Sequence, residues 1–354
     1  MEKNAKRLAL TLAVIIAAIV ALVLISGCND QSEPLPTEEP AAEGEKTPEP
    51  AEPVKVLAHW KLQDNKDYYT GSIDDDTIGF KDLTGNGNDL IAKAAGNGDQ
   101  LDIFSWDKDI SSASYKFGSA LKLNNTKALA ASVDPYKAAE TEYTGGYTSG
   151  KYLETVKGAP INSYGFKNGV SIELIFKLSE DLDLDYNRYA GIFSRQGVIE
   201  DQNEPPFSIA ITEWDASETS KLGTTPTWLQ LLIMDDVSRL NTEMDEILIK
   251  AGEWHHVLVT LSEMGKVLVY LDGQKLFESW TAFEGIFCSD PNFSWEVGVG
   301  RKSGTGHESD SKNENVAEGM IRRLFAGSVA EIKVHDGDIT VEESLYATEF
   351  VNSK

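Results

Sequence analysis

The amino-acid sequence predicts an all-β protein in which two antiparallel sheets pack as a sandwich. Apolar and polar side chains alternate from the start of the folded part, with Val56, Ala58 and Trp60 on one side and Leu57 and His59 on the other. A period of two is typical of a β-strand with one buried face. Many short segments of this kind follow, and few have the period of a helix. Many short strands and few helices favour a sandwich.

The expected strands are alternating or short apolar segments that lie between turn-forming residues. They cover residues 56–62, 119–123, 170–178, 190–194, 207–212, 228–234, 254–261, 267–271, 275–279, 295–299 and 327–335. The clearest connection between two of them is Asp272-Gly273, because this dipeptide accepts the positive φ angles of a two-residue turn. We therefore expect a hairpin that joins residues 267–271 to residues 274–277.

The C-terminus carries the clearest helical pattern. Thr340 and Glu343 have the spacing of a capping box, in which each side chain satisfies a backbone N–H at the start of a helix. Val341, Leu345 and Tyr346 would form the apolar side of this short helix. We expect the helix to close the domain.

Two stretches are expected to be long loops. Residues 134–169 are rich in Tyr and Gly, and residues 301–319 are polar throughout. Loops of this length in a compact domain are usually functional or disordered.

The start of the chain has the features of an export signal. Basic residues precede an unbroken apolar run over residues 8–25, which is followed by Ser26, Gly27 and Cys28. Ile25-Ser26-Gly27-Cys28 resembles the bacterial lipobox, so residues 1–28 are expected to be a lipoprotein signal peptide with Cys28 as the lipidated residue. The rest of the protein would then lie on the extracytoplasmic side of the cell membrane. An uncleaved transmembrane helix is the alternative, since a span needs about 20 residues.

Residues 29–55 are expected to form a disordered linker. This segment carries six prolines and many glutamates, and it has almost no large apolar side chains. Such a segment cannot bury enough surface to offset the entropy lost on ordering. No second linker follows, so residues 56–350 are expected to be one folded domain.

Composition restricts the partners and the covalent restraints of this domain. The formal net charge is -25 and the pI is near 4.5. Nucleic-acid binding needs clustered Lys and Arg that release counterions, so no nucleic-acid partner is expected. Apart from Cys28 the chain has a single cysteine, Cys288, and no disulfide can therefore form within the folded part.

The order of several motifs resembles the laminin-G-like domains of the concanavalin A-like lectin/glucanase superfamily. The motifs are AHWKL at 58–62, DLTGNGND at 82–89, FGSAL at 117–121, VSIELIF at 170–176, GEWHHV at 252–257, VYLDG at 269–273 and FAGSVAEI at 325–332. The resemblance implies a jelly roll of two antiparallel sheets. It also implies that a concave face or its rim loops hold carbohydrate, and that a calcium ion ties loops to the sheet edge.

The sequence departs from this family where calcium would bind. Gln63 and Ala330 stand at positions where many relatives carry acidic residues. Calcium takes six to eight oxygen ligands, several of them anionic. The side chains that remain as candidate calcium ligands are those of Asp64, Asp82, Asn88 and Glu331.

One acidic run has the spacing of a glycan-hydrolysing site. Glu213 and Glu218 belong to a Glu-x-Asp-x-x-Glu sequence that follows the expected strand 207–212. Two carboxylates about 5.5 Å apart suit a retaining glycosidase. The residues after Ala216 indicate a loop rather than the central strand that such enzymes use, so catalysis is the weaker interpretation.

Aromatic side chains near loops provide a second kind of candidate site. Sugar C–H faces stack on aromatic rings, while acidic and amide side chains bind the hydroxyls. The candidate ligand-binding residues are Trp214, Trp228, Asp235, Asp236, Asn241, Tyr143 and Tyr147.

Three functions remain open from the sequence. The first is a non-catalytic surface lipoprotein whose lectin-like domain binds carbohydrate or a protein at the cell envelope. The second is a glycoside hydrolase of the jelly-roll class that uses Glu213 and Glu218. The third is a purely structural or adhesive envelope protein.

Overall fold

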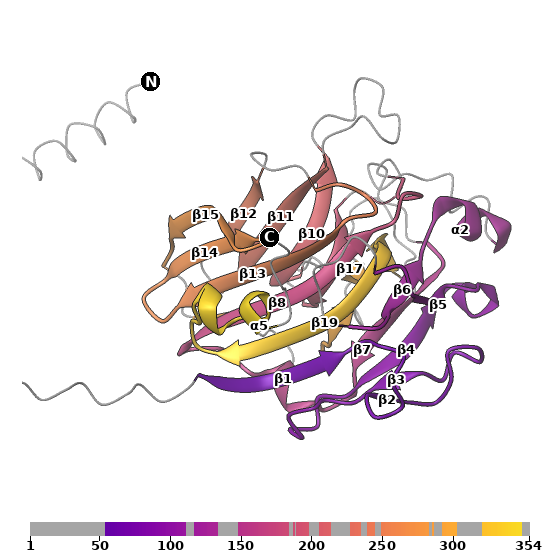
Figure 1. Cartoon of the computed structure of the whole chain (residues 1–354), viewed down its shortest axis with the longest axis horizontal. Coiled ribbons are helices and arrows are strands. Elements are labelled where there is room, and N and C mark those ends of the chain that lie inside the picture. The colour runs from indigo at the N-terminus through magenta and orange to yellow at the C-terminus, as the bar shows by residue number, and fades with distance from the viewer. Residues whose placement is uncertain are drawn as a thin grey trace, which may run out of the picture. The chain divides into compact units, whose positions relative to one another are not determined.

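A computed structural model describes residues 54–110, 117–133, 148–183, 187, 189–197, 205–213, 227–234, 239–244, 249–282, 285–286, 292–302 and 321–348. Within them, two antiparallel sheets pack face to face, as the sequence predicts, and a short helix follows the last strand (Figure 1). None of these residues belongs to a helix that is long and apolar enough to cross a membrane.

The first sheet has eight strands and is organised around the long strand β19. One side of β19 pairs with β8, and its other side pairs with β6 and then with β1. In spatial order the strands are β15 (Gln274–Trp280), β14 (Lys266–Leu271), β13 (Trp254–Ser262), β8 (Gly169–Leu178), β19 (Ala326–Asp336), β6 (Ala120–Asn124) and β5 (Phe104–Asp107), with β1 (Lys55–Lys61) beside β19.

The second sheet has nine strands, and all of its pairings are antiparallel. Their order is β12 (Arg239–Met244), β11 (Thr227–Met234), β10 (Phe207–Glu213), β9 (Ala190–Arg195), β16 (Trp295–Val297), β7 (Gly150–Thr155), β4 (Leu90–Ala95), β3 (Gly79–Phe80) and β2 (Tyr69–Thr70). A separate two-stranded ribbon is formed by β17 (Val299–Lys302) and β18 (Ile321–Leu324).

Among the described residues, the helical segments that connect or close these strands are all short. They are η1 (Gly98–Gln100), α2 (Lys127–Val133), η3 (Pro160–Ser163), η4 (Val341–Glu343) and α5 (Leu345–Thr348). The predicted capping box is confirmed, since the backbone N–H of Thr340 donates to Glu343 Oε2 at 2.8 Å. The helical segment breaks at Ser344 into η4 and α5, and Leu345 is its fully buried apolar residue.

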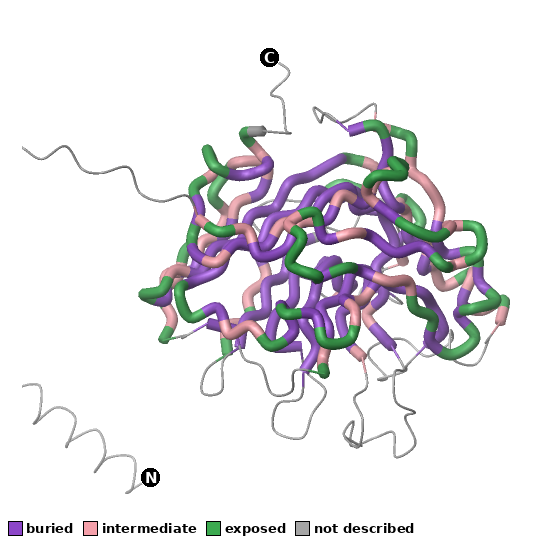
Figure 2. Tube along the Cα trace, turned by 90° about the horizontal axis from the view of Figure 1, so that it is seen from below, coloured by how far each residue is buried: buried purple, intermediate pink, exposed green. Residues whose placement is uncertain are grey.

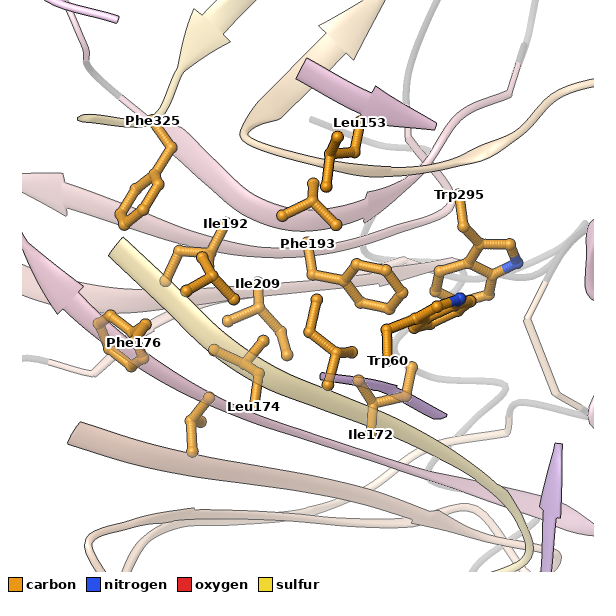
Figure 3. Packing of buried hydrophobic residues seen from close by; sticks show 14 of the residues in the cluster. Trp60, Leu153, Ile172, Leu174, Phe176, Ile192, Phe193, Ile209, Trp295 and Phe325 are labelled. Atoms are coloured by element: carbon orange, nitrogen blue, oxygen red, sulfur yellow. The ribbon is translucent and has the colours of Figure 1, made fainter. Parts of the chain in front are cut away.

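The core lies between the two sheets, where apolar side chains from both converge (Figure 3). Trp60 of β1 and Trp295 of β16 both contact Phe193 of β9, and the rings of Phe193 and Trp295 stack with centroids 5.1 Å apart. The tube in Figure 2 shows buried residues along the strands and exposed residues mainly at turns and edges. Each buried aromatic ring contributes roughly 1.5–3 kcal/mol relative to an exposed one.

The predicted hairpin is confirmed. β14 and β15 are joined by Asp272 and Gly273, whose φ angles are 50° and 75°. Two consecutive positive φ angles give the turn that matches the right-handed twist of paired strands. The Asp272 carboxylate also accepts a hydrogen bond from the His256 backbone N–H at 2.8 Å, which fixes the turn against β13.

Two predictions from the sequence are wrong in the nine-stranded sheet. The stretch 134–169, expected to be a loop, contains β7 and η3, and β7 pairs with β4 and β16 inside the nine-stranded sheet. The expected strand 295–299 is interrupted at Gly298, where φ is 92° and the chain leaves the sheet to begin β17. Only glycine adopts such a φ angle without steric cost.

Candidate functional site

A row of residues crosses the outer face of the nine-stranded sheet, on the side opposite the core. Each member is the direct Cα partner of the next on the neighbouring strand. From β12 to β4 the row consists of Asn241, Leu232, Ser208, Ser194, Glu296, Glu154 and Ile91. At about 4.8 Å per strand, the part from Asn241 to Glu154 spans about 24 Å.

Two carboxylates in this row lie on adjacent strands and share one lysine. Lys302, at the end of β17, places its Nζ 2.5 Å from Glu154 Oε2 and 3.2 Å from Glu296 Oε1. Ser294 Oγ lies 3.0 Å from Glu296 Oε1, and Lys93 Nζ lies 3.3 Å from Glu154 Oε1. We call Glu154, Glu296, Lys302, Ser294 and Lys93 the carboxylate cluster.

The backbone turn at Gly298 creates this cluster. Because the chain leaves the sheet after Val297, β17 crosses over β9 and brings Lys302 back to the carboxylates. A Cβ added to Gly191 of β9 would lie 2.3 Å from Cα of Gly300, so the two backbones can approach this closely only without side chains.

Burial and neighbouring charges shift the pKa values of Glu296 and Lys302 in the carboxylate cluster. Burial raises the pKa of Glu296 to about 7, against the effect of Lys302 and with a further rise from Glu154. Burial alone would lower the pKa of Lys302, but Glu296, Tyr152 and Glu154 together raise it above its usual range. The lysine therefore stays charged at neutral pH, while Glu296 is poised between its acid and its carboxylate.

Two buried polar atoms of this region have no hydrogen-bond partner among the described residues. They are Glu296 Oε2 and Gln196 Nε2. Gln196 joins the cluster through its other amide atom, since Oε1 accepts a hydrogen bond from the Lys302 backbone N–H at 3.0 Å. Buried polar groups are normally paired, so this acceptor and this donor each leave a hydrogen bond to be made by a bound water or polar ligand.

The cluster is accessible from one side. Glu296 is fully buried, whereas the side chains of Glu154, Lys302 and Lys93 are 15%, 21% and 42% exposed. The site therefore becomes more exposed from Glu296 toward Lys93. Tyr152 packs beside the cluster on β7, with Lys302 Nζ 5.3 Å from its ring centroid.

One predicted binding residue, Asn241, belongs to the row that crosses the nine-stranded sheet. Asn241 is exposed at the β12 end, and its Oδ1 accepts a hydrogen bond from Gln230 Nε2 at 2.9 Å. Trp228 lies on β11 and alternates to the same face as Gln230, and only 9% of it is exposed. The other predicted binding residues, Trp214, Asp235, Asp236, Tyr143 and Tyr147, lie outside the described residues.

Only one member of the predicted catalytic pair belongs to the described residues. Glu213 is the last residue of β10, paired with Thr227, and Glu218 lies outside the described residues, as does Cys28. Sequence reasoning missed Glu154, Glu296 and Lys302. The alternation of Tyr152 and Glu154 with Leu153 and Thr155 was the signal that could have indicated a strand there.

Two of the predicted calcium ligands organise the loop that follows β3. Asp82 accepts hydrogen bonds from the backbone N–H groups of His59, Thr84 and Asn88 at 3.2, 3.0 and 3.1 Å. The Asn88 amide donates to the carbonyl of Leu57 at 2.9 Å and to Asp82 at 3.1 Å. These bonds match the framework role that a tight Gly-containing loop requires.

The other two candidates contact different partners. Glu331 Oε1 lies 2.7 Å from His59 Nε2, and its Oε2 lies 3.7 Å from Lys61 Nζ. Asp64 accepts a hydrogen bond from the Tyr69 hydroxyl at 3.1 Å. In the part of the chain that the structure describes, no group of three or more His, Cys, Asp or Glu side chains is arranged to hold a metal ion.

A second buried carboxylate lies on the outer face of the eight-stranded sheet. Glu173 Oε1 lies 2.9 Å from His335 Nε2, and its Oε2 lies 3.1 Å from His256 Nε2. The backbone N–H of Leu345 also donates to Glu173 Oε2 at 2.6 Å. Burial would raise the pKa of Glu173, but the two histidines lower it to about 2. This network attaches the C-terminal segment to the sheet.

Comparisons with known proteins found similar solved structures and no similar sequence. No protein-family model matches the chain, and no curated protein is significantly similar to it in sequence. Among solved structures, the chain is similar to domain 4 of AbnA, a GH43 extracellular arabinanase from Geobacillus stearothermophilus, in complex with arabinotriose. The identity is 17%, the TM-score is 0.42, and 82% of this chain and 97% of that chain are covered.

Two further structures are similar at the same level. The binding domain of Paraclostridial Mosquitocidal Protein 1 is 10% identical with a TM-score of 0.44, over 83% of this chain and 51% of that chain. An endo-β-1,4-glucuronan lyase from the fungus Trichoderma reesei is 15% identical with a TM-score of 0.41, over 79% of this chain and 95% of that chain. All three TM-scores lie below 0.5, so these similarities carry no argument about this protein.

Proposed function

We propose that this protein is a lipid-anchored protein of the cell envelope whose β-sandwich binds a polysaccharide at the carboxylate cluster. The observation that carries this proposal is the pair of buried atoms without partners, Glu296 Oε2 and Gln196 Nε2, in a cluster that opens to solvent through Glu154 and Lys302. One atom accepts and the other donates a hydrogen bond. A sugar hydroxyl does both, so it can bind either atom.

The two solvent-accessible ends of the row, Asn241 and Glu154, are separated by more than one sugar ring. The row from Asn241 to Glu154 spans about 24 Å across the strands, which is longer than a single sugar ring. Its hydroxyl, amide and carboxylate side chains are of the kinds that bind sugar hydroxyls. The middle of the row is buried, and Asn241 and Glu154 are its solvent-accessible ends. The net charge of -25 disfavours an acidic polymer, because most of the surface would repel it. We therefore propose a neutral polysaccharide.

The lipid anchor and the family relationship are parts of the same proposal. The apolar run 8–25 and the lipobox-like sequence that ends at Cys28 support lipidation of that cysteine. The motif order from AHWKL to FAGSVAEI supports a relationship to laminin-G-like domains. A polymer-binding domain on a tether would hold envelope polysaccharide at the outer side of the membrane.

The proposal is tested by affinity measurements with the purified full chain on a panel of neutral envelope polysaccharides. Glu296→Gln keeps the size of the side chain and replaces the free carboxylate oxygen, so we expect a tenfold or greater loss of affinity, about 1.4 kcal/mol or more. The matched control is Glu278→Gln, another lysine-paired glutamate, on β15 of the other sheet. No binding by the wild type, or equal binding by both variants, would contradict the proposal.

One observation favours a second function, glycoside hydrolysis at the same cluster. Glu154 and Glu296 are direct partners on adjacent strands, where Cβ atoms lie about 5 Å apart. Burial raises the pKa of Glu296 to about 7, a value suited to a general acid. Release of reducing ends from a bound polysaccharide, abolished by Glu296→Gln, would identify this function. Binding without such release leaves the non-catalytic function.

A further inference from the structure

Two large apolar side chains project into solvent at one turn of the eight-stranded sheet. Met264 is 81% exposed and Trp280 is 64% exposed, and among the described residues only Leu83 is a further exposed large hydrophobic residue. Lys266 pairs with Trp280 across β14 and β15, and the Thr281 backbone N–H donates to the Gly265 carbonyl at 2.8 Å. Met264 and Trp280 therefore lie at the same end of adjacent strands, and we call the two side chains the Met264–Trp280 patch.

The patch lies at the end of the sheet where the chain enters the domain. Ser262 pairs with Gly169, Ser171 pairs with His335, and Lys55 pairs with Asp336, so the β13–β14 turn and the first residue of β1 share one end (Figure 1). Five strand spacings separate β1 from β15, which places the patch about 24 Å from Lys55.

We infer that the Met264–Trp280 patch contacts the surface of a lipid bilayer, namely the membrane to which Cys28 attaches the chain. This inference rests on the lipid anchoring of the proposed function. The tryptophan ring has an apolar body and a polar N–H, and such rings are enriched at membrane–water interfaces. A methionine side chain adds flexible apolar contact. Moving both side chains from water to the membrane interface removes apolar surface from water, which is favourable.

The linker makes even a weak contact effective. Residues 29–55 span at most roughly 80 Å when fully extended in a polyproline-like form. A tether of this length keeps the domain at a high effective concentration near the bilayer, so two side chains suffice to bias its orientation. The linker joins the domain at the end that carries the patch. The domain therefore does not have to turn over for the patch to face the membrane.

The charges around the patch fit the headgroup region rather than the hydrocarbon interior. Lys266 Nζ lies 5.7 Å from the Trp280 ring centroid and 3.0 Å from Glu278 Oε1, so it is already paired. Lys55 and Lys167 are exposed at the same end. Ammonium groups there meet lipid phosphates, which offsets the repulsion expected from a chain of net charge -25. The exposed Glu263 beside Met264 disfavours deeper insertion.

The test uses the full lipoprotein reconstituted into phosphatidylcholine vesicles whose acyl chains carry bromine near the headgroup. Bromine quenches a tryptophan only at close range, so we expect quenching of the wild-type fluorescence relative to unbrominated vesicles. Trp280→Phe should lose most of that quenching, and Met264→Ser should reduce it. The matched control is Trp106→Phe, since Trp106 is half-buried against Tyr69 and Phe80 and should leave the quenching unchanged.

Co-flotation of the protein with the vesicles separates the two proposals. If the chain does not float, the anchor and the patch contact are both wrong. If it floats and Trp280→Phe is quenched as strongly as the wild type, the anchor stands and the patch contact is wrong. Quenching of Trp280 by polysaccharide fragments and not by brominated lipid would make the patch a sugar site and also overturn the inference. Unchanged thermal unfolding of the variants confirms that they are folded.

Discussion

Glu154 and Glu296 lie directly opposite each other on β7 and β16, and the Lys302 ammonium binds both carboxylates. Glu154 is far in the sequence from Glu296 and Lys302, which lie on the consecutive strands β16 and β17. Their charges do not cancel, because one lysine lies between two acids and the more buried acid retains an oxygen without a partner among the described residues. This arrangement determines how the stability of the domain should depend on pH.

Glu296 should make the protein less stable as the pH rises through neutrality. The pKa of its carboxyl is raised from 4.5 to about 7 in the folded state, so the folded chain holds a proton that the unfolded chain has lost. Between pH 4.5 and pH 7 the free energy of unfolding should therefore fall, by up to about 1.4 kcal/mol per pH unit from this group. Glu296→Gln should remove that fall in urea denaturation at pH 5 and pH 8. A wild-type slope in the variant would contradict the assignment, and Glu278→Gln is the control.

Glu173 should have the opposite effect in acid. Burial acts to raise the pKa of Glu173, but His256 and His335 lower it to about 2, so its stabilising contribution is present above pH 4.5 and is lost as the pH falls toward 2. Glu173→Gln should lower the free energy of unfolding at pH 7 by about 3 kcal/mol, because the histidines and the Leu345 N–H lose a charged partner. The difference from the wild type should shrink at pH 3. An exposed acid, Glu263→Gln, should change neither value.

Two tryptophans should respond differently to truncation. Trp60 is fully buried and its indole N–H donates to the Asn88 carbonyl at 2.7 Å, whereas Trp280 is 64% exposed. Trp60→Ala should reduce the free energy of unfolding by about 3–5 kcal/mol. Trp280→Ala should change it by less than about 0.5 kcal/mol. Chemical denaturation followed by circular dichroism measures both, and equal losses would contradict the core assignment.

Gly273 should tolerate alanine less well than Gly85, although their φ angles are 75° and 76°. An added Cβ at Gly85 meets nothing within 4 Å, but at Gly273 it would lie 2.5 Å from Cε1 of Tyr346. Gly85→Ala reports the strain of the positive φ alone, about 1 kcal/mol. Gly273→Ala should cost about 1–3 kcal/mol more.

The Tyr346 contact can be checked by a double-mutant cycle. In a Tyr346→Ala background the obstructing ring is absent, so Gly273→Ala should cost the same as Gly85→Ala. An unchanged extra cost in that background would mean that the turn backbone, and not the contact with α5, causes the difference.

The sequence predicted most of the fold because strand patterns and turn chemistry are local. The alternation from Val56 to Leu62 and the Asp272-Gly273 turn each depend on a few neighbouring residues, and the structure confirms both. The same reasoning missed β7, because its residues Gly150–Thr155 include the charged Lys151 and Glu154 and few apolar side chains. Their strand conformation depends on pairing with β4 and β16.

The candidate site could not be predicted, because no local pattern connects its members. By itself the sequence determined that the domain is an antiparallel sandwich, and it indicated Asn241 as a polar residue near one face. Only the tertiary structure placed Glu154 opposite Glu296 and returned Lys302 to them through the turn at Gly298. Strand register and chain reversal are set by the packing of distant segments, and charges become a site only where that packing removes them from water.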